Sequence, residues 1–309
     1  MNKVYVLGSM NMDIVLKVKD MPQIGETIMS KSMEKIPGGK GANQAVAAKR
    51  SGADVYMIAK VGMDENGIIL AEELEKDDIN VQYVFKDDKE PTGMAIINVD
   101  DNGDNSIIVV SGANMAITSS EISSTEKALV GSDIVIAQLE TPMDMSIEAF
   151  KLAKKHNKLT ILNPAPAREI DEELLKYTDI IIPNETEAAL LTKIEVKDLE
   201  SGKQAAEEFF KKGVRCVIIT LGERGAAVIT KENSEIVPAY KVEAVDTTAA
   251  GDSFIGALSS TLDAENMNFE DIKAAVKFGN KVSSIAVQRQ GAQPSIPYLS
   301  EVLDIYREE

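Results

Sequence analysis

Short apolar runs alternate with helix-like stretches along the whole chain. The runs lack the alternation of a strand with one wet face, and continuous apolar strands are typical of a parallel sheet covered on both faces. They are Val4–Leu7, Val55–Ile58, Ile134–Ala137, Leu159–Leu162, Asp179–Ile182 and Val217–Thr220. The helix-like stretches are Asn43–Ser51, Gly67–Asp77, Met145–Lys155, Glu185–Leu191, Gly202–Lys212, Asp252–Leu262 and Ile272–Val287. This order predicts an α/β fold with a central, mostly parallel sheet flanked by helices.

Two segments interrupt this order and predict a second, smaller β-sheet. Residues 13–36 hold strand-like pieces without a convincing helix, and residues 92–111 read as two strands around the turn Asp100–Asp104. Such a sheet would project from the main one, either as a lid over a site or as an ordinary edge extension. The expected division is a main domain of residues 1–12, 37–91 and 112–309, and a discontinuous β lid of residues 13–36 and 92–111.

Composition excludes several classes of protein. The 309 residues include 33 basic and 50 acidic side chains, a net charge of −17, which excludes binding to nucleic acid or membrane through a generally basic surface. No apolar run approaches a membrane span or a secretory signal, so we expect a cytoplasmic protein. The single cysteine, Cys216, lies in an apolar run and is expected to be a packed thiol. The single histidine, His156, is expected at a solvated helix end, which argues against histidine-based catalysis.

The stretch Pro37–Gln44 is the first candidate site. It places three glycines in four positions directly before a predicted helix. Glycine lets a backbone approach a ligand closely, and a helix start offers N–H groups without partners. Lys40 and Asn43 bring polar side chains to the same place. A tight strand–helix turn without any ligand is the alternative interpretation.

The stretch Ala244–Phe254 is the second candidate. Small residues precede a helix predicted to start near Gly251, so the amides of Ala249, Ala250 and Gly251 can form an anion hole reinforced by the helix dipole. Asp252 follows directly, and a carboxylate beside an anion hole suits phosphoryl transfer to an alcohol. The alternative is that Asp252 is only the N-cap of the helix.

Other polar segments follow predicted strands and are weaker signals one by one. Asn184–Glu187 has the spacing of a helix capping box, or could lie near phosphates and hydrated Mg²⁺. Thr220–Gly225 turns the chain between strands and is a weak signal for nucleotide binding. In Ser9–Asp13, Asn11 and Asp13 share one face of an extended chain, where both could bind one polyol. Glu140 ends a strand at the carboxyl edge, where α/β proteins bind ligands.

Taken together, these stretches resemble the ribokinase-type carbohydrate kinase family. The segments GGKGAN (Gly38–Asn43) and DTTAAGD (Asp246–Asp252) look like the two defining motifs of that family. Further matches, in family order, are Asn163–Arg168, Asn184–Glu187, Thr220–Gly225 and Gly291–Ser295. The resemblance covers residues 4 to 297, which is nearly the whole chain.

The resemblance implies an activity and an assembly. The reaction would be transfer of the ATP γ-phosphoryl group to the 5-hydroxyl of D-ribose, giving D-ribose 5-phosphate. A kinase for 2-deoxyribose or another small sugar is the alternative, and a regulator without catalysis is a more distant one. The lid would be built from the two strand-rich segments, and the lids of two subunits would pack together into a homodimer.

The resemblance also implies a role for each matching residue. Asp252 matches the catalytic base, and Ala249, Ala250 and Gly251 match the anion hole. The positions that match the sugar site are Asn11, Asp13, Gly39, Lys40, Asn43, Glu140 and Asp252. Those that match the ATP site are Asn184, Thr220, Gly222, Glu223, Gly225, Gly251 and Asn280. Glu187 matches the residue that organises Mg²⁺, through water. The positions that match a K⁺ site are Asp246, Thr248, Ala286, Arg289, Gly291 and Ser295.

Overall fold

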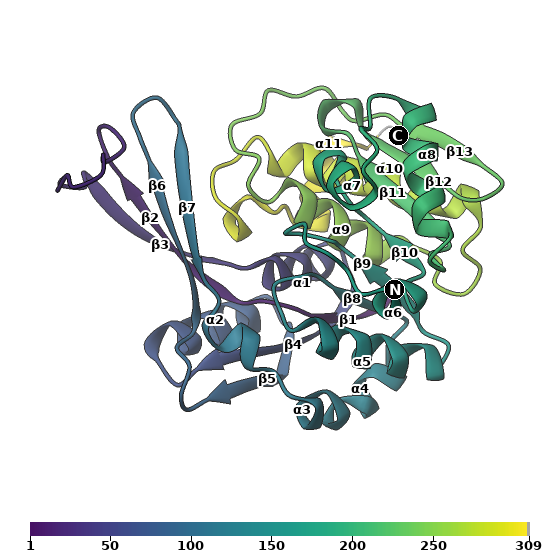
Figure 1. Ribbon diagram of the computed structural model, residues 1–309, viewed down its shortest axis with the longest axis horizontal. Helices are drawn as coiled ribbons and strands as arrows, with labels where there is room; N and C mark the ends of the chain where they lie inside the picture. The colour runs from purple at the N-terminus through teal and green to yellow at the C-terminus, as the bar shows by residue number, and fades with distance from the viewer. Residues whose placement is uncertain (308–309) are drawn as a thin grey trace.

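The computed structural model describes residues 1–307 and is built around a nine-stranded sheet (Figure 1). Its strands lie in the order β13-β12-β11-β10-β9-β8-β1-β4-β5. They are β1 (Lys3–Leu7), β4 (Asp54–Gly62), β5 (Asn80–Asp87), β8 (Ile134–Ala137), β9 (Leu159–Leu162), β10 (Ile180–Ile181), β11 (Cys216–Thr220), β12 (Ala226–Ile229) and β13 (Ser234–Val237). The pairs from β5 through β11 are parallel, and β12 and β13 add antiparallel. The predicted, mostly parallel α/β fold is confirmed.

Helices cover both faces of this sheet and create two apolar cores (Figure 1). In β1, Val4 and Val6 face one core while Tyr5 and Leu7 face the other, which explains why the strand shows no polar alternation. The helices of eight or more residues are α1 (Lys40–Arg50), α2 (Glu65–Lys76), α5 (Met143–Lys155), α7 (Glu185–Thr192), α8 (Leu199–Phe210), α9 (Ala250–Thr261) and α10 (Phe269–Ala286). Shorter ones are α3 (Ser119–Ser124), α4 (Glu126–Gly131), α6 (Glu172–Lys176) and α11 (Leu299–Ile305), with the 3₁₀ turns η1 (Gly112–Ala116), η2 (Gly222–Arg224) and η3 (Gln293–Ser295). Within residues 1–307, no helix has the length and apolar character needed to cross a membrane.

The second sheet consists of four strands and projects from the main body (Figure 1). Its order is β3-β2-β6-β7, with β2 (Asn11–Lys17), β3 (Ser32–Gly38), β6 (Gly93–Val99) and β7 (Asn105–Val110). The predicted turn is present: Asp100 accepts hydrogen bonds from the amides of Asn102 and Asp104, and Gly103 has φ 87°. Because β2 begins at Asn11 and β3 ends at Gly38, the sheet joins the main body at the two segments singled out as candidate sites.

The two residues expected to carry no chemistry lie away from these segments. Cys216 is buried in β11, and burial raises the pKa of its thiol to about 12. His156 is the C-cap of α5, where its Nε2 lies 3.0 Å from a carboxylate oxygen of Glu126.

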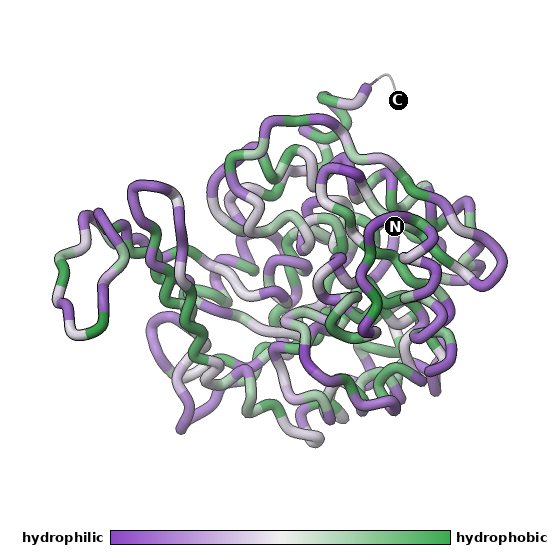
Figure 2. Tube along the Cα trace, turned by 45° about the horizontal axis from the view of Figure 1, so that its top comes forward, coloured by the Kyte–Doolittle hydropathy of each residue, from purple (hydrophilic) through white to green (hydrophobic). Residues whose placement is uncertain are grey.

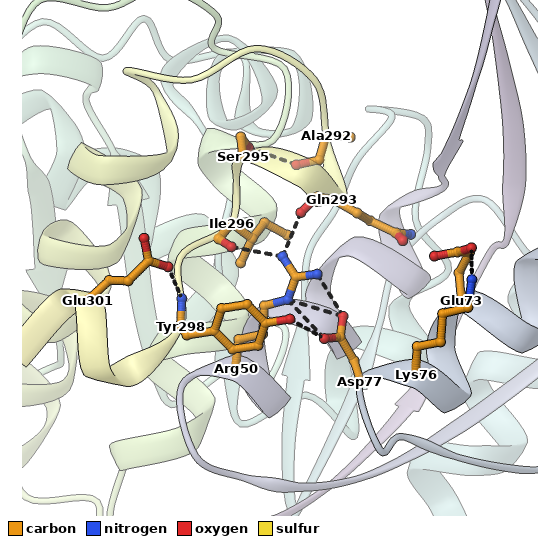
Figure 3. Close-up of polar contacts among 10 residues, drawn as sticks. All are labelled: Arg50, Glu73, Lys76, Asp77, Ala292, Gln293, Ser295, Ile296, Tyr298 and Glu301. Carbon is orange, nitrogen blue, oxygen red and sulfur yellow. Dashed lines mark hydrogen bonds and ion pairs between the residues drawn. The ribbon is translucent and has the colours of Figure 1, made fainter.

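Arg50, the last residue of α1, fastens the C-terminal segment to the main body (Figure 3). Its guanidinium donates to the Asp77 carboxylate at 2.8 to 3.2 Å and to the carbonyls of Gln293 and Ile296, both at 2.8 Å. Tyr298 completes the cluster: its ring lies 4.7 Å from the guanidinium carbon, and its hydroxyl donates to Asp77. One side chain thus joins the ends of α1 and α2 to the turn η3.

Replacing Arg50 by Met should lower the free energy of unfolding by about 2–4 kcal/mol. The variant leaves the largely buried Asp77 carboxylate without its cation and two carbonyls without their donor. Urea denaturation measures the change. Lys211→Met, which breaks an exposed pair with Glu208, is the matched control and should cost under about 1 kcal/mol. Equal costs for the two variants would contradict this account of the cluster.

Candidate functional site

The glycine-rich start of α1 is packed against the loop that follows β1. Gly39 is the N-cap with φ 92°, and a Cβ there would lie 2.7 Å from the Asn11 amide. A Cβ on Gly41 would lie 2.6 Å from the backbone of Gly8. Only glycine allows this close crossing of two chain segments. The crossing brings the Ser9–Asp13 and Pro37–Gln44 segments together, as a shared polyol site requires.

Asp252 lies in the first turn of α9 with 6% of its surface exposed. It is not the helix N-cap: that position is Ala249, and the helix has no side-chain cap. The alternative interpretation of Asp252 as a capping residue is therefore wrong. Its carboxylate is instead held by α1, since Oδ2 accepts from Asn43 Nδ2 at 3.1 Å and Oδ1 accepts from Gln44 Nε2 at 2.9 Å.

The three backbone amides predicted to form an anion hole precede Asp252. In this structure the Ala250 amide donates to the Thr247 carbonyl at 3.1 Å, so this amide must leave that bond to bind an anion. Ala250 and Gly251 line the same cavity as Asp252. A phosphoryl group in that cavity would thus meet the N-terminal end of α9, where the helix dipole favours negative charge.

Four carboxylates and one lysine influence one another at this site: Asp13, Glu140, Glu187, Asp252 and Lys40. The Lys40 pKa is raised, first by the charge of Asp252 and then by Glu140 and Glu187. Asp13 lies in β2, and its pKa is raised to about 7 by burial, with contributions from the charges of Glu140 and Asp252. Lys40 is thus the counter-ion of a crowded acidic cluster, in which burial and neighbouring charges disfavour the ionised form of Asp13.

Glu140 is held by hydrogen bonds, and one buried atom of Asn43 is left without a partner in the described part of the chain. Glu140 accepts a hydrogen bond from the Ser9 hydroxyl and a longer one, 3.4 Å, from the Lys40 amide. Asn43 donates to Asp252, but its Oδ1 is buried and has no hydrogen-bond partner within residues 1–307. A buried acceptor of this kind is costly unless a ligand donor satisfies it, and a sugar hydroxyl can do so.

A cavity of about 400 Å³ opens from Asp252 toward the predicted nucleotide segments. Of the predicted residues it is lined by Lys40, Asn184, Glu187, Thr220, Gly222, Gly225, Thr248, Ala250, Gly251, Asp252 and Asn280. Glu223 does not line it, although it lies in the same turn, η2. Segments distant in the sequence therefore converge on one cavity, as the strand-end pattern predicts.

The Asn184–Glu187 segment is both a capping box and a wall of the cavity. Asn184 Oδ1 accepts from the Glu187 amide at 2.7 Å, and Glu187 Oε2 accepts from the Asn184 amide at 2.9 Å. The capping interpretation is thus confirmed, and Glu187 also lines the cavity. Burial raises the Glu187 pKa, against the effects of the Asn184 amide and Lys40. With ATP phosphates and water supplying the other oxygens, this carboxylate fits the oxygen-rich coordination of Mg²⁺.

The predicted K⁺ positions are partly joined by hydrogen bonds. Asp246 accepts from the Thr248 amide at 2.9 Å and, through its other oxygen, from the Gly291 amide at 2.9 Å. Burial disfavours its charged form, but the bonds from Thr248 and Gly291 hold the Asp246 pKa below its usual range. Ser295 adds a buried hydroxyl, which donates to the Ala292 carbonyl. Carboxylate, hydroxyl and carbonyl oxygens are the donors that hard cations take. Within residues 1–307, no group of three or more His, Cys, Asp or Glu side chains is arranged to hold a metal.

The sequence did not reveal several residues that support the site. Asn114 accepts a hydrogen bond from the Met10 amide and donates one to Asn11 Oδ1 at 2.7 Å. The Asn11 oxygen is therefore occupied by Asn114, and its side-chain nitrogen points away from Asn114. Gln44, Gln138 and Asn163 form a buried network behind Asp252. The only sequence signal for these residues was a polar side chain inside a motif or at the end of an apolar run.

Comparisons with known proteins agree with this geometry. Residues 1–299 match the family model described as pfkB family carbohydrate kinase. A ribokinase of Staphylococcus aureus is 46% identical over 97% of this chain and 98% of its own length. A bifunctional ribokinase/ribose-5-phosphate isomerase A of Fructilactobacillus sanfranciscensis is also 46% identical, and the chain spans 57% of that protein's length. The structure of Arabidopsis thaliana ribokinase complexed with ribose and ATP superposes with a TM-score of 0.91 at 32% identity, covering 100% of this chain and 99% of the other.

The chain belongs to the pfkB family of carbohydrate kinases. The family resemblance, the fold class and the expectation of a carbohydrate kinase are confirmed.

Proposed function

We propose that this protein transfers the γ-phosphoryl group of ATP to the 5-hydroxyl of D-ribose, giving D-ribose 5-phosphate and ADP. The observation that carries the proposal is the position of Asp252. Its buried carboxylate accepts a hydrogen bond from Asn43, a predicted sugar-site residue, and it also lines the cavity that contains the predicted nucleotide-site residues. The ribokinases among its relatives, one solved with ribose and ATP, support the choice of both substrates. Because ATP is the co-substrate, we assign the reaction to the cytoplasm, which cell fractionation would test.

In the proposed reaction Asp252 accepts the proton of the sugar hydroxyl as its oxygen attacks the γ-phosphorus. The bond between the γ-phosphorus and the β–γ bridging oxygen breaks, and ADP leaves with that oxygen. The amides of Ala249, Ala250 and Gly251 stabilise the transferred charge at the start of α9, and Lys40 adds a positive charge. Asn11, Asp13, Gly39, Asn43 and Glu140 bind the sugar in this scheme. Glu187 would hold Mg²⁺ through water, and the ion would neutralise further phosphate charge.

On the nucleotide side, the proposal assigns ATP to the 400 Å³ cavity. Asn184, Thr220, Gly222, Gly225 and Asn280 are its proposed contacts there, with Glu223 beside them. Asn280 is already oriented, since its Nδ2 donates to the carbonyls of Val237 and Pro238 at 3.2 and 3.0 Å. Its Oδ1 is therefore the atom that can accept from a ligand.

A panel of sugars tests the proposal. ATP consumption by the purified protein is measured with ribose, 2-deoxyribose, fructose, tagatose and adenosine, with Mg²⁺ and K⁺ present. A clear preference in kcat/KM for ribose is the expected result. A preference for 2-deoxyribose would overturn the choice of substrate and retain the chemistry, while no turnover on any substrate would overturn the proposed activity.

We further propose that K⁺ binds between the Asp246–Thr248 turn and the Gly291–Ser295 segment and orders the start of α9. Replacing K⁺ by Na⁺ at equal ionic strength should lower kcat several-fold. K⁺ should also raise the thermal midpoint of the protein without substrates more than Na⁺ does, because a ligand that binds only the native state stabilises it. Equal rates and equal midpoints in both salts would contradict the site. Ala286 and Arg289 are its remaining proposed members.

The proposal also includes two structural points. The chain is divided into a main domain and a β lid, and two copies form a homodimer through that lid. Strand β7 exposes Ile107, Ile108 and Val109 by more than half, and hydrophobic stretches continue along the projecting sheet (Figure 2). Light scattering should give about twice the chain mass of 33.4 kDa. Ile108→Glu should convert the dimer to a monomer, while Ile305→Glu, at an equally exposed site in α11, should not. A monomeric unmodified protein would contradict the dimer.

A further inference from the structure

A chain of buried side-chain amides ends on Asp252. Gln44, which is fully buried in α1, donates from Nε2 to Asp252 Oδ1 at 2.9 Å and to Asn163 Oδ1 at 3.1 Å. Its Oε1 accepts from Gln138 Nε2 at 2.7 Å. Asn163 is fixed in turn, since its Nδ2 donates to the Ile182 carbonyl at 3.1 Å. Both amide hydrogens and the carbonyl of Gln44 are therefore engaged.

The carboxylate fixes the direction of every bond in this chain. An ionised Asp252 only accepts, so Gln44 must present its nitrogen to it. The Gln44 oxygen then faces Gln138, which must present its own nitrogen. The two glutamine amides are thereby oriented in series with their donor ends toward Asp252, and turning the Gln44 amide would break its three hydrogen bonds.

The cost of this arrangement argues against a purely structural role. Gln138 Oε1 is buried and has no hydrogen-bond partner within residues 1–307, which is unfavourable. The backbone also makes room for it, since a Cβ on Gly8 would lie 2.1 Å from this oxygen. Apolar side chains would fill the same space without an unsatisfied oxygen. What the amides provide and apolar side chains cannot is a pair of neutral donors in series, aimed at one oxygen of Asp252.

We propose that Gln44 is a positioning residue for Asp252 and that Gln138 acts through Gln44. The inference rests on the proposed function, because it takes Asp252 as the base. Asn43 holds Oδ2 and Gln44 holds Oδ1, so the plane of the carboxylate is set by two side chains of α1. Both donors are neutral, so neither brings a positive charge to the carboxylate. Without Gln44 the carboxylate turns about its χ2 bond, and fewer complexes have an oxygen aligned with the sugar hydroxyl.

The test is a double-mutant cycle with Gln44→Met and Gln138→Met, which keep the side-chain length and remove the amides. We expect kcat to fall about 10- to 100-fold in Gln44→Met and about 3- to 10-fold in Gln138→Met, with KM for ribose within about 3-fold. In the Gln44→Met background, the Gln138→Met change should have no further effect on kcat, because its route to Asp252 is already lost. Thr125→Val, which removes a buried hydroxyl bonded to Tyr5 on another part of the sheet, should change the thermal midpoint and leave kcat unaltered.

The outcomes separate this inference from the proposed function. If the unmodified protein phosphorylates ribose and Asp252→Asn does not, the base is established. An unchanged kcat in Gln44→Met, or losses that multiply in the double variant, would then overturn the positioning role alone. If Gln44→Met does not fold, Gln138→Met decides: a full kcat in that variant overturns the inference. The positioning role would also be overturned if kcat fell in proportion to the thermal midpoint in every variant, including Thr125→Val.

Discussion

Replacing Asp252 by Asn is expected to reduce kcat for ribose by at least about 10³-fold while ribose affinity changes only a few-fold. The variant keeps the volume of the side chain and removes the group that accepts the proton. Its new amide nitrogen can replace Oδ2 and face Asn43, while its oxygen still accepts from Gln44. Asn43 can turn its amide to accept from that nitrogen, because its Oδ1 has no hydrogen-bond partner within residues 1–307. The fold and the polyol contacts should therefore survive. A coupled assay for ADP measures kcat, and calorimetry measures ribose binding.

The matched control for that experiment is Asp263→Asn. Asp263 is a half-buried residue just after α9 that accepts hydrogen bonds from the neighbouring Asn266, so its replacement should leave kcat unaltered. Retention of turnover above about a tenth in Asp252→Asn would remove Asp252 from the role of base. A loss of ribose affinity equal to the loss of turnover would instead indicate a binding residue.

The strands that the sequence predicted best are those buried on both faces. β8 and β9 have the bounds expected from Ile134–Ala137 and Leu159–Leu162, because each apolar run coincides with the paired segment. Edge strands gave no such signal: β5 at one edge of the sheet consists of half-buried and exposed residues, and in β13 at the other edge only Val237 is buried. Their pairing depends on a neighbouring strand that the local sequence does not encode.

The start of α1 was predicted too late, at Asn43 instead of Lys40. Glycine disfavours helix by about 1 kcal/mol relative to alanine, so Gly41 counted against an earlier start. Its presence follows from tertiary packing, since a side chain there would collide with Gly8.

Most candidate site residues were predictable from their motifs, but their partners were not. That Asp252 would be held by Gln44 depends on how α9 packs on α1. Gly256 permits this packing, because a Cβ there would lie 2.5 Å from the Gln44 carbonyl oxygen. The spacing within each motif contains no information on the register between two helices about 200 residues apart in the chain.

The second large effect concerns Asp13, whose replacement by Asn should stabilise the protein and damage its function. The Asp13 pKa is about 7 in the folded protein against 3.8 for an unperturbed aspartate, because of burial and the charges of Glu140 and Asp252. The folded state therefore holds a proton that the unfolded chain releases between these two pH values. Stability is lost as pH rises through this window, and above it the ionised Asp13 costs up to about 4 kcal/mol. Asparagine carries no charge and avoids that cost.

The expected difference in unfolding free energy between Asp13→Asn and the unmodified protein is thus close to zero near pH 4. It grows to about 2–4 kcal/mol in favour of the variant at pH 8. Urea denaturation across this range measures it, with Asp20→Asn, at an exposed position beside the second sheet, as the control that should show no such trend. Ribose affinity should fall about 10- to 100-fold, since a hydrogen bond to a charged acceptor is lost.

A pH-independent difference in unfolding free energy would mean that Asp13 is ionised without penalty. The predicted trend with unaltered ribose affinity would mean that Asp13 is buried for a reason other than the sugar. If both changes occur together, the acidic cluster lowers stability in the unliganded protein and provides the acceptors that the sugar needs, a trade that binding sites commonly make.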